Sequence, residues 1–539
     1  MLKKIISFYI AFSFTGCFIS NAQVHRICST VEHDKYIRSL HPEYAKERDE
    51  LESKIADYIT SHPAQRYSGV TVNIPVVVHI VWDSLHPERN LSDEQIVSQI
   101  DVLNEDFNIT NANIAEVPSV WANLVGSSRL IFSLARKDEN GNPTNGITRR
   151  KSPVTSFSLS DAVKFDSSGG SNAWDNNHFL NIWVCNLESG SSAILGYAQY
   201  PSNVSPETDG IVINYQAFGR TGTDLKDQYN LGRTATHEIG HWLNLVHIWG
   251  DDDACSLSDH INDTPNQGEA TYGCPSSPHA SCNNSPNGDM FQNYMDYTDD
   301  KCMMFFTTDQ RARMNAAFTM YRDTLRYAEL YTMNDIPMPN DLKITAIDSP
   351  AGLICNKYML PGVKIQNAGS NTVTSFTLGY RIDDDTMMYQ EWTGSLLPSE
   401  STELVLSKTL IPEDLHVFTT QITEVNGGSD DFTLDNFRTS SFLYAPSRYS
   451  CPVYPEIPEI KIEPNLTNNG IIIETKYKEA QKATLSIYNI LGDRIYSRDY
   501  LESHGQTVSV DVNGFASGMY FVEIKTFDKQ VSQRFVVYH

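Results

Sequence analysis

The apolar positions in the first half of the chain predict strands that alternate with helices. Residues Ile74–Trp82 form a continuous β-branched run, which is typical of a buried strand. Ser92 and Gln95 have the spacing of a capping box, and the helix that they begin carries one apolar face, made of Ile96, Ile100, Leu103 and Phe107. The other expected elements are strands at Leu180–Cys185 and Gly210–Tyr215 and helices at Thr234–Val246 and Thr307–Leu325. This mixture predicts an α/β or α+β unit.

The pattern changes beyond about Thr332. A Pro-containing linker is followed by short alternating runs with turn residues between them, such as Val363–Ile365, Thr374–Arg381 and Thr402–Leu406. A second Pro-rich segment precedes more runs of the same kind. The sequence therefore predicts two all-β sandwich domains, at about residues 340–450 and 458–539.

The N-terminal residues are typical of an export signal. Lys3 and Lys4 precede an apolar stretch, Ile5–Phe14, and small residues up to Ala22 offer a cleavage position. Residues 1–22 are therefore predicted to be a signal peptide, and a lipoprotein signal ending at Cys17 is the alternative. Residues 23–65 form a short charged segment, helical over Asp34–Ile59, which has too few apolar positions to fold alone. We expect this segment to dock on the unit that follows it.

Composition narrows the class of protein. The chain has 539 residues, 40% of them hydrophobic, and a formal net charge of −25, with no dense basic tract. These values describe an acidic multidomain globular protein, so neither nucleic acid nor an anionic membrane is expected as its main partner. No segment predicts a transmembrane span. We expect a monomer that is secreted, or held at the outer-membrane surface.

One stretch carries candidate chemistry, Thr236-His237-Glu238-Ile239-Gly240-His241, with His247 six residues farther on. His237 and His241 are four residues apart, so a helix presents both imidazoles on one face to a single ion. His247 can be the third ligand if the helix ends sharply before it. Zinc in such a site acidifies a water, and Glu238 is placed to take the proton as general base while the water attacks a carbonyl. The alternative is a helix with surface histidines.

These residues resemble the metzincin signature HExxHxxGxxH, and more closely the signature of the pappalysin family of zinc metallopeptidases. The resemblance implies an α/β metzincin catalytic domain over residues 66–330. The family usually has Gly where this chain has Asn244, the position at which the helix turns through a left-handed conformation that Asn also tolerates. Asn293-Tyr294-Met295-Asp296-Tyr297 resembles the family's Met-turn. It implies that Met295 lies under the histidines and that Tyr297 donates to the oxyanion of the substrate.

The resemblance also implies disulfides and a second metal. The cysteines of residues 255–302 have the family's spacings, and the implied pairs are Cys255–Cys282 and Cys274–Cys302. The residues alone allow three pairings, and a zinc site made of all four thiolates is a further alternative. A loop between these cysteines resembles a calcium site, with Asp259, Thr264 and backbone carbonyls near Leu257 and Asn262 as ligands. Its alternative is an Asp/Asn-rich turn that binds nothing.

Latency and specificity are further implications of the resemblance. Arg26-Ile27-Cys28-Ser29-Thr30 resembles the start of the family's pro-segments, which implies that the Cys28 thiolate blocks the zinc until the segment is removed. The alternative is a spare cysteine. Because the family often cleaves before Arg or Lys, maturation is expected near Gln65-Arg66. Asp299 and Asp300 are candidates for the carboxylate that such a preference needs, and the sequence does not separate them; the alternative is that both are solvated loop aspartates.

The C-terminal modules carry weaker patterns. Asp341-Leu342 and Asn367-Ala368-Gly369 resemble a bacterial Ig-like domain, in which Cys355 and Cys451 are candidates for a bridge. Glu463-Pro464-Asn465 and residues 516–521 resemble the C-terminal sorting domain of type IX secretion cargo. The alternative is a second binding sandwich without an export role.

Taken together, the sequence predicts a secreted, latent zinc-dependent endopeptidase with a structural calcium ion, acting on protein substrates before Lys or Arg. One alternative is a surface adhesin with a vestigial metal site, which the retained Glu238 disfavours. The other is a metal-dependent hydrolase of non-protein substrates, and only the family resemblance argues against it.

Overall fold

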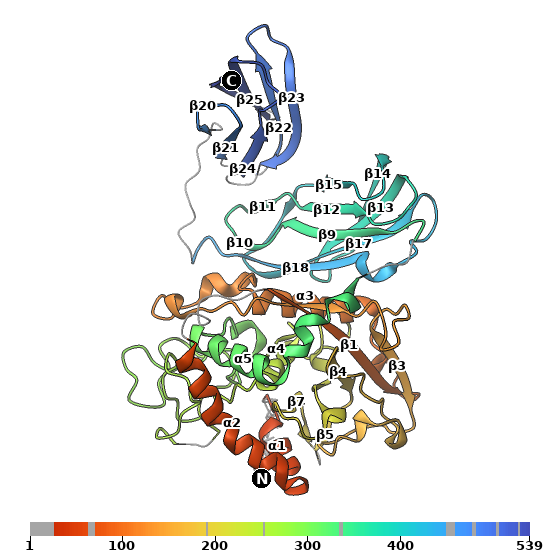
Figure 1. Cartoon of the computed structure of the whole chain (residues 1–539), viewed down its shortest axis with the longest axis vertical. Coiled ribbons are helices and arrows are strands. Elements are labelled where there is room, and N and C mark those ends of the chain that lie inside the picture. Colours follow the sequence, from red (N-terminus) through yellow and green to blue (C-terminus); the bar gives the residue numbers. More distant parts are fainter. Residues whose placement is uncertain are drawn as a thin grey trace, which may run out of the picture.

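The structure is a computed structural model that describes residues 26–62, 71–189, 192–251, 254–333, 338–448, 459–476, 481–502, 506–526 and 529–539. The predicted signal peptide, Cys17, the Gln65-Arg66 cleavage position and Cys451 lie outside the described residues, so these predictions stay open. Figure 1 shows a large α/β unit, a β unit next to it and a second β unit at the C-terminus.

The α/β unit is built on a mostly parallel six-stranded sheet. In spatial order its strands are β2 (Leu130–Leu134), β1 (Val72–Asp83), β4 (Leu180–Cys185), β8 (Ile211–Asn214) and β7 (Gly196–Ala198), with β3 (Ile147–Ser152) also paired to β1. Only β7 runs antiparallel to its neighbour, and it forms one edge of the sheet. A small hairpin, β5 (Glu188–Ser189) and β6 (Ser192–Ala193), precedes it. The predicted central strand is confirmed.

Strand β1 is apolar without alternation because both of its faces are covered. Ile74, Val76 and Val78 point into the main core, which also contains helices α3 (Asp93–Phe107) and α4 (Arg233–Trp242). Val81 points into a separate core on the other face. The predicted apolar face of α3 is buried in the main core, which fixes α3 beside α4.

The predicted helices differ in detail from the observed ones. The helix expected over Asp34–Ile59 is two helices, α1 (Thr30–Leu40) and α2 (Pro42–Ser61), because Pro42 lacks an amide hydrogen and begins a new helix. The last helix of the unit, α5, spans Thr308–Tyr321 and is shorter than the expected Thr307–Leu325. It has a complete capping box at Thr307. The capping box of α3 is half formed: Ser92 accepts from the Gln95 amide, but the Gln95 side chain donates to Phe218.

Helices α1 and α2 dock on the α/β unit, as expected for a segment without its own core. Leu51 and Ile55 of α2 pack on Ala316 and Ala317 of α5. Figure 1 shows both helices, in red, along one side of the α/β unit near β7.

The rest of the described chain is largely β. In the first β unit the five-stranded sheet has the order β10 (Gly352–Ile354), β18 (Phe437–Tyr444), β17 (Asp414–Val425), β13 (Val373–Ile382) and β14 (Met388–Leu396). The three-stranded sheet has the order β15 (Ser401–Val405), β12 (Gly362–Asn367) and β9 (Leu342–Ser349), and a short pair joins β11 (Tyr358–Met359) to β16 (Thr409–Leu410). One apolar core contains side chains from both larger sheets.

The C-terminal unit is also built from a three-stranded and a five-stranded sheet. Its three-stranded sheet is β19 (Glu459–Glu463), β21 (Gly470–Lys476) and β24 (Gln506–Asp511). Its five-stranded sheet is β20 (Leu466–Thr467), β26 (Gln530–Val537), β25 (Gly518–Thr526), β22 (Gln481–Asn489) and β23 (Arg494–Glu502), and the two sheets again share a core. Among the described helices, none combines the length and the apolar character that a membrane crossing requires.

Candidate active site

The structure brings His237, His241 and His247 together. Their Nε2 atoms lie 3.1–3.3 Å from one another, and all three rings are buried. Zinc–nitrogen bonds of about 2.0–2.1 Å in tetrahedral geometry separate two ligand nitrogens by about 3.3 Å. The three imidazoles are therefore spaced as ligands of one tetrahedral ion.

Each imidazole is held by an acceptor at its other nitrogen. Nδ1 of His237 lies 2.6 Å from the Tyr294 carbonyl, and Nδ1 of His241 lies 2.7 Å from the Leu245 carbonyl. Nδ1 of His247 pairs with the Asp251 carboxylate. Since an acceptor at Nδ1 fixes the proton there, the Nε2 lone pairs face the common point. Burial lowers the pKa of His237 far below its usual range and that of His241 to about 3, so both rings are neutral, as metal ligation requires.

The third histidine reaches the site because α4 ends early. The helix ends at Trp242 rather than at the expected Val246, and Asn244 adopts a left-handed conformation with φ of 71°. The Leu245 amide then donates to the Gly240 carbonyl, 2.9 Å away. This is the turn that the sequence requires, with Asn accepted in place of Gly.

Met295 forms a floor beneath the histidine helix. A Cβ atom on Gly240 would lie 2.5 Å from the Met295 sulfur, so the glycine allows the close approach. Met295 is fully buried, in the position that the Met-turn resemblance implies.

Glu238 lies beside the three histidines and is fully buried. One carboxylate oxygen accepts from the Thr30 hydroxyl at 2.8 Å and lies 3.5 Å from the Cys28 sulfur, while the other has no hydrogen-bond partner among the described residues. Burial raises the pKa of Glu238 to about 7. A carboxylate whose affinity for protons is raised in this way is suited to take and return a proton.

Cys28 completes the group. Its Sγ and one nitrogen from each of His237, His241 and His247 all lie within 4.8 Å of one another. The backbone around it pairs in parallel with edge strand β7, where the Ser29 amide donates to the Gly196 carbonyl at 3.0 Å. The pro-segment thus lies along the sheet edge with its thiol on the histidine cluster.

Two further contacts of this segment involve residues that the sequence singled out. The Tyr297 hydroxyl donates to the Cys28 carbonyl at 3.0 Å. The buried Arg26 guanidinium lies 2.5 Å from the Asp300 carboxylate and also donates to Thr234 and to the Thr298 carbonyl. Of the two candidate aspartates it is Asp300 that forms an ion pair with Arg26.

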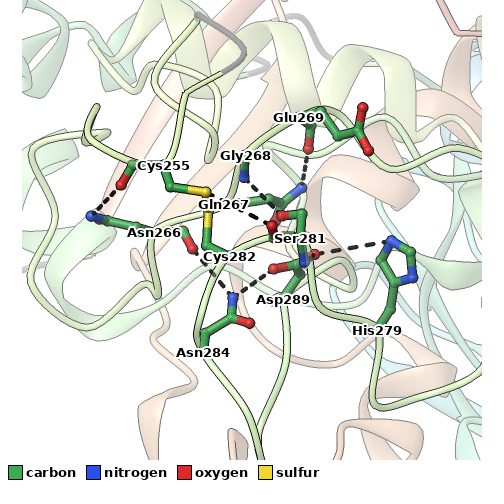
Figure 2. The surroundings of a disulfide bond; sticks show 10 residues. All are labelled: Cys255, Asn266, Gln267, Gly268, Glu269, His279, Ser281, Cys282, Asn284 and Asp289. Carbon is green, nitrogen blue, oxygen red and sulfur yellow. Dashed lines mark hydrogen bonds and ion pairs between the residues drawn. A yellow bond between two sulfur atoms is a disulfide. The ribbon is translucent and has the colours of Figure 1, made fainter.

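The cysteine-rich segment contains both disulfides that the resemblance implied, Cys255–Cys282 and Cys274–Cys302. Figure 2 shows Cys255–Cys282 beside Asp289, which accepts from the Ser281 amide and the Asn284 side chain. All four thiols are consumed, which excludes the four-thiolate zinc site. Cys355 is also disulfide-bonded, and Cys185 is a buried free thiol.

The residues of the expected calcium loop differ in their exposure. Asp259 is buried and accepts from the Thr264 hydroxyl at 2.8 Å and from the Ile261 amide at 3.0 Å. Burial raises the pKa of Asp259 to about 7, which means that the ionised carboxylate lacks a compensating charge. Leu257 and Asn262, whose backbone carbonyls are the other expected ligands, are exposed.

Sequence reasoning missed the acceptors that orient the histidines. Asp251 carried a usable signal, because it follows His247 by four residues. The carbonyls of Tyr294 and Leu245 carried none, since a backbone acceptor depends only on chain geometry.

Comparison with known proteins adds independent findings. The model of the peptidase M43 family, described as pregnancy-associated plasma protein-A, matches residues 165–319. An extracellular metalloprotease of Pyricularia oryzae is 31% identical over 264 residues, which cover 48% of this chain and 78% of that protein. The model of a secretion system C-terminal sorting domain matches residues 461–538.

Solved structures are similar over the same region. A mutant of Tannerella forsythia promirolysin is 46% identical with a TM-score of 0.51, and the match covers 57% of this chain and 100% of that one. Mature mirolysin of the same organism, in complex with a cleaved peptide, is 50% identical with a TM-score of 0.47 and covers 50% of this chain.

Proposed function

Since the chain belongs to the peptidase M43 family, that of pregnancy-associated plasma protein-A, we propose that it is a zinc endopeptidase whose ion is held by His237, His241 and His247. The observation that carries this proposal is the triangle of Nε2 atoms 3.1–3.3 Å apart. Without a cation, three buried nitrogen lone pairs aimed at one point would repel one another.

The class of enzyme, the domain types and the cellular location follow from the similarity to known proteins. The chain is a metallopeptidase with a metzincin-type catalytic domain and a largely β C-terminal region, and it carries a type IX sorting domain. It is a secreted or cell-surface protein. We further propose that residues 340–450 and 458–539 form two β-sandwiches, since each contains two sheets around one core.

In addition to the ion, two side chains, Glu238 and Tyr297, act in catalysis. A bound zinc ion supplies Lewis-acid polarisation. Glu238 takes a proton from the attacking water and returns it to the leaving amide nitrogen, and its burial favours both transfers. The Tyr297 hydroxyl, which donates to a peptide carbonyl in this structure, stabilises the oxyanion of the substrate in the same way.

Latency follows from the position of Cys28. The Cys28 sulfur and the three histidine nitrogens lie within 4.8 Å of one another, so Cys28 would be a fourth ligand of an ion held there, and the attached backbone occupies the β7 edge that an extended substrate would use. Burial raises the pKa of the Cys28 thiol well above its usual range, and a bound cation offsets this by stabilising the thiolate. Removal of the pro-segment therefore exposes both the ion and the edge strand.

Specificity for Arg or Lys is supported by Asp300. Its carboxylate is fully buried, yet it pairs with the Arg26 guanidinium of a segment that maturation removes. After removal, a buried carboxylate without a basic partner favours substrates that bring one. We also propose that Asp259, Thr264 and the carbonyls of Leu257 and Asn262 hold a calcium ion, which would supply the charge that buried Asp259 lacks.

The mechanism is tested on the full chain, processed with a trace of immobilised trypsin that is removed before casein is added as substrate. Glu238→Ala should retain one equivalent of zinc by elemental analysis while casein cleavage falls by about a thousandfold or more. The matched control is Glu207→Ala, an exposed glutamate that should change neither quantity. Undiminished casein cleavage by Glu238→Ala would refute the proposed role of Glu238.

The preference is tested by sequencing the new N-termini of the casein fragments. The wild type should generate fragments that begin with Arg or Lys. Asp300→Asn should lose that bias, whereas Asp299→Asn, at the half-buried neighbouring position, should keep it. An equal loss in both variants would argue against Asp300 as the selecting carboxylate.

A further inference from the structure

Helix α2 contacts the turn between the second and third histidines through the side chain of Asn244. Arg48 of α2 donates to Oδ1 of Asn244 at 2.5 Å, and Nδ2 of Asn244 donates to the Glu52 carboxylate at 3.3 Å. Arg313 of α5 links the same groups, because it donates to the Asn244 carbonyl and to both oxygens of Glu52. One turn of α2 therefore satisfies every polar atom of the Asn244 side chain.

This contact is buried and reaches the histidines. Asn244 is fully buried, and Arg48 and Arg313 are 5% and 3% exposed. The Arg48 guanidinium lies over the Tyr200 ring, 4.2 Å from its centroid, and the Tyr200 hydroxyl lies 3.4 Å from Nδ1 of His241. Buried hydrogen bonds to charged groups are the stronger class of polar contact, so α2 is held here by more than its apolar face.

We propose that α2 is a second inhibitory anchor of the pro-segment, which recognises the side chain of Asn244 independently of Cys28. Glycine, the usual residue at this position in the signature, has no side chain for Arg48 and Glu52 to bind. The proposal rests on the proposed function of the histidine site. Its consequence is that a cut near residue 65 does not free the enzyme at once, because the severed segment is still bound at two places about 20 residues apart.

The anchor is tested first without activity, in full-length proenzyme carrying Glu238→Ala. Hydrogen exchange should become about tenfold faster in residues 42–61 when Arg48 is changed to Ala, a change that matches the loss of one hydrogen bond to a charged group. The Ser29 amide, bonded to β7, should keep its protection. Lys54→Ala is the control, because Lys54 is on the same helix but exposed, and its hydrogen bond is to Glu50 of the same helix. Unchanged exchange in Arg48→Ala, or equal effects in both variants, would overturn the proposal.

Recognition of Asn244 itself is tested by a double-mutant cycle. Gly adopts a φ of 71° without strain, so Asn244→Gly should keep the turn and speed α2 exchange as Arg48→Ala does. The double variant should be no faster than either single one. Additive effects would contradict a direct contact between the two side chains.

A second readout uses the active full-length chain. Arg48→Ala and Glu52→Gln alter only the segment that is removed, so the mature enzymes have identical sequences. These variants should shorten the lag before cleavage of a fluorogenic peptide about tenfold, and Lys54→Ala should not. A normal lag in both would contradict the anchor. If no variant ever cleaves the peptide while exchange responds as expected, the proposed function fails and the anchor stands.

Discussion

At the scale of single residues, the histidine cluster depends on the oxygens that hold each Nδ1 in place. Two of these oxygens are backbone carbonyls that no substitution removes, and the third is the Asp251 carboxylate on His247. Asp251 is therefore the one place at which the orientation of a histidine can be altered without changing the histidine. Its role is to position His247, not to touch substrate.

We expect Asp251→Ala to weaken zinc binding about 10–100-fold, the usual cost of removing a carboxylate that orients a metal-ligating histidine. Competition with a chromophoric chelator measures the affinity in the activated enzyme. Asp227→Asn, at an exposed position of the same unit, is the control and should bind zinc like the wild type. Equal affinities in all three proteins would mean that His247 needs no orienting partner.

Gly196 limits the space around the general base. A Cβ atom there would lie 2.9 Å from both Cγ and Oε1 of Glu238 and 3.0 Å from the Val212 carbonyl across the strand pair. Gly196→Ala should therefore displace the carboxylate and lower kcat about tenfold or more, with the zinc content unchanged. Measuring kcat and the zinc content of the same preparation distinguishes a displaced Glu238 from a damaged metal site. A loss of zinc in parallel with activity would show that the strand, not Glu238, had moved.

The residues that the sequence could place are those with a fixed spacing. His237, Glu238 and His241 follow from the helical period, and Cys28 and Met295 lie at the site where the family resemblance implied. Thr30, which donates to Glu238, and Arg48, which binds Asn244, could not be placed, because both depend on how a separate segment docks. Docking of that kind is decided by tertiary packing and leaves no periodic signal.

At the scale of elements, strands and helices with strong apolar patterns were predicted closely, whereas helix ends were not. Helix α4 ends four residues before its apolar pattern does, since Leu243 and Leu245 are buried by the turn rather than by a helix. An apolar period records burial, and burial in a tight turn gives the same pattern as burial on a helix.

The cysteine-rich loop has little core of its own, so disulfides and metal should stabilise it. If calcium compensates Asp259, EGTA should lower the melting temperature of the full-length chain, and added calcium should restore it. Asp259→Asn should abolish this response, whereas Glu269→Gln, exposed in the same loop, should retain it. Differential scanning fluorimetry measures both. A full calcium response in Asp259→Asn would place the ion elsewhere.

At the scale of the whole molecule, the first β unit is hydrogen-bonded to a largely buried ion pair of the α/β unit. Arg220 pairs with Glu105 of α3 at 2.7 Å and donates to Thr439 of β18, and Glu105 also accepts from the Ser441 hydroxyl. Hydrogen bonds to charged groups contribute about 1.5–3 kcal/mol each, so separating the two units is costly. The two units should therefore unfold together rather than as independent domains.

Beside this junction lies a pocket whose lining includes Asp341, Asp435 and Arg136. The pocket disfavours the ionised form of the Asp435 carboxyl. Burial, and then the neighbouring Asp341, raise the pKa of Asp435 to about 8. Both oxygens of Asp341 lack a hydrogen-bond partner among the described residues, and Arg136 is 3.7 Å from Asp435. The folded state therefore binds a proton that the unfolded chain, with an ordinary carboxyl pKa near 4, has released at neutral pH.

The sign of the pH dependence follows from this difference. Where the folded state binds more protons than the unfolded state, the free energy of unfolding falls as pH rises, here between about pH 4 and pH 8. Asp435→Asn removes the ionisation, so it should raise the melting temperature by about 3 °C at pH 8.5 and leave it unchanged at pH 4. Calorimetry on the Glu238→Ala proenzyme avoids self-digestion, and Asp384→Asn, at an exposed position, is the control. A gain at pH 4 as large as at pH 8.5 would attribute the effect to packing instead of to charge.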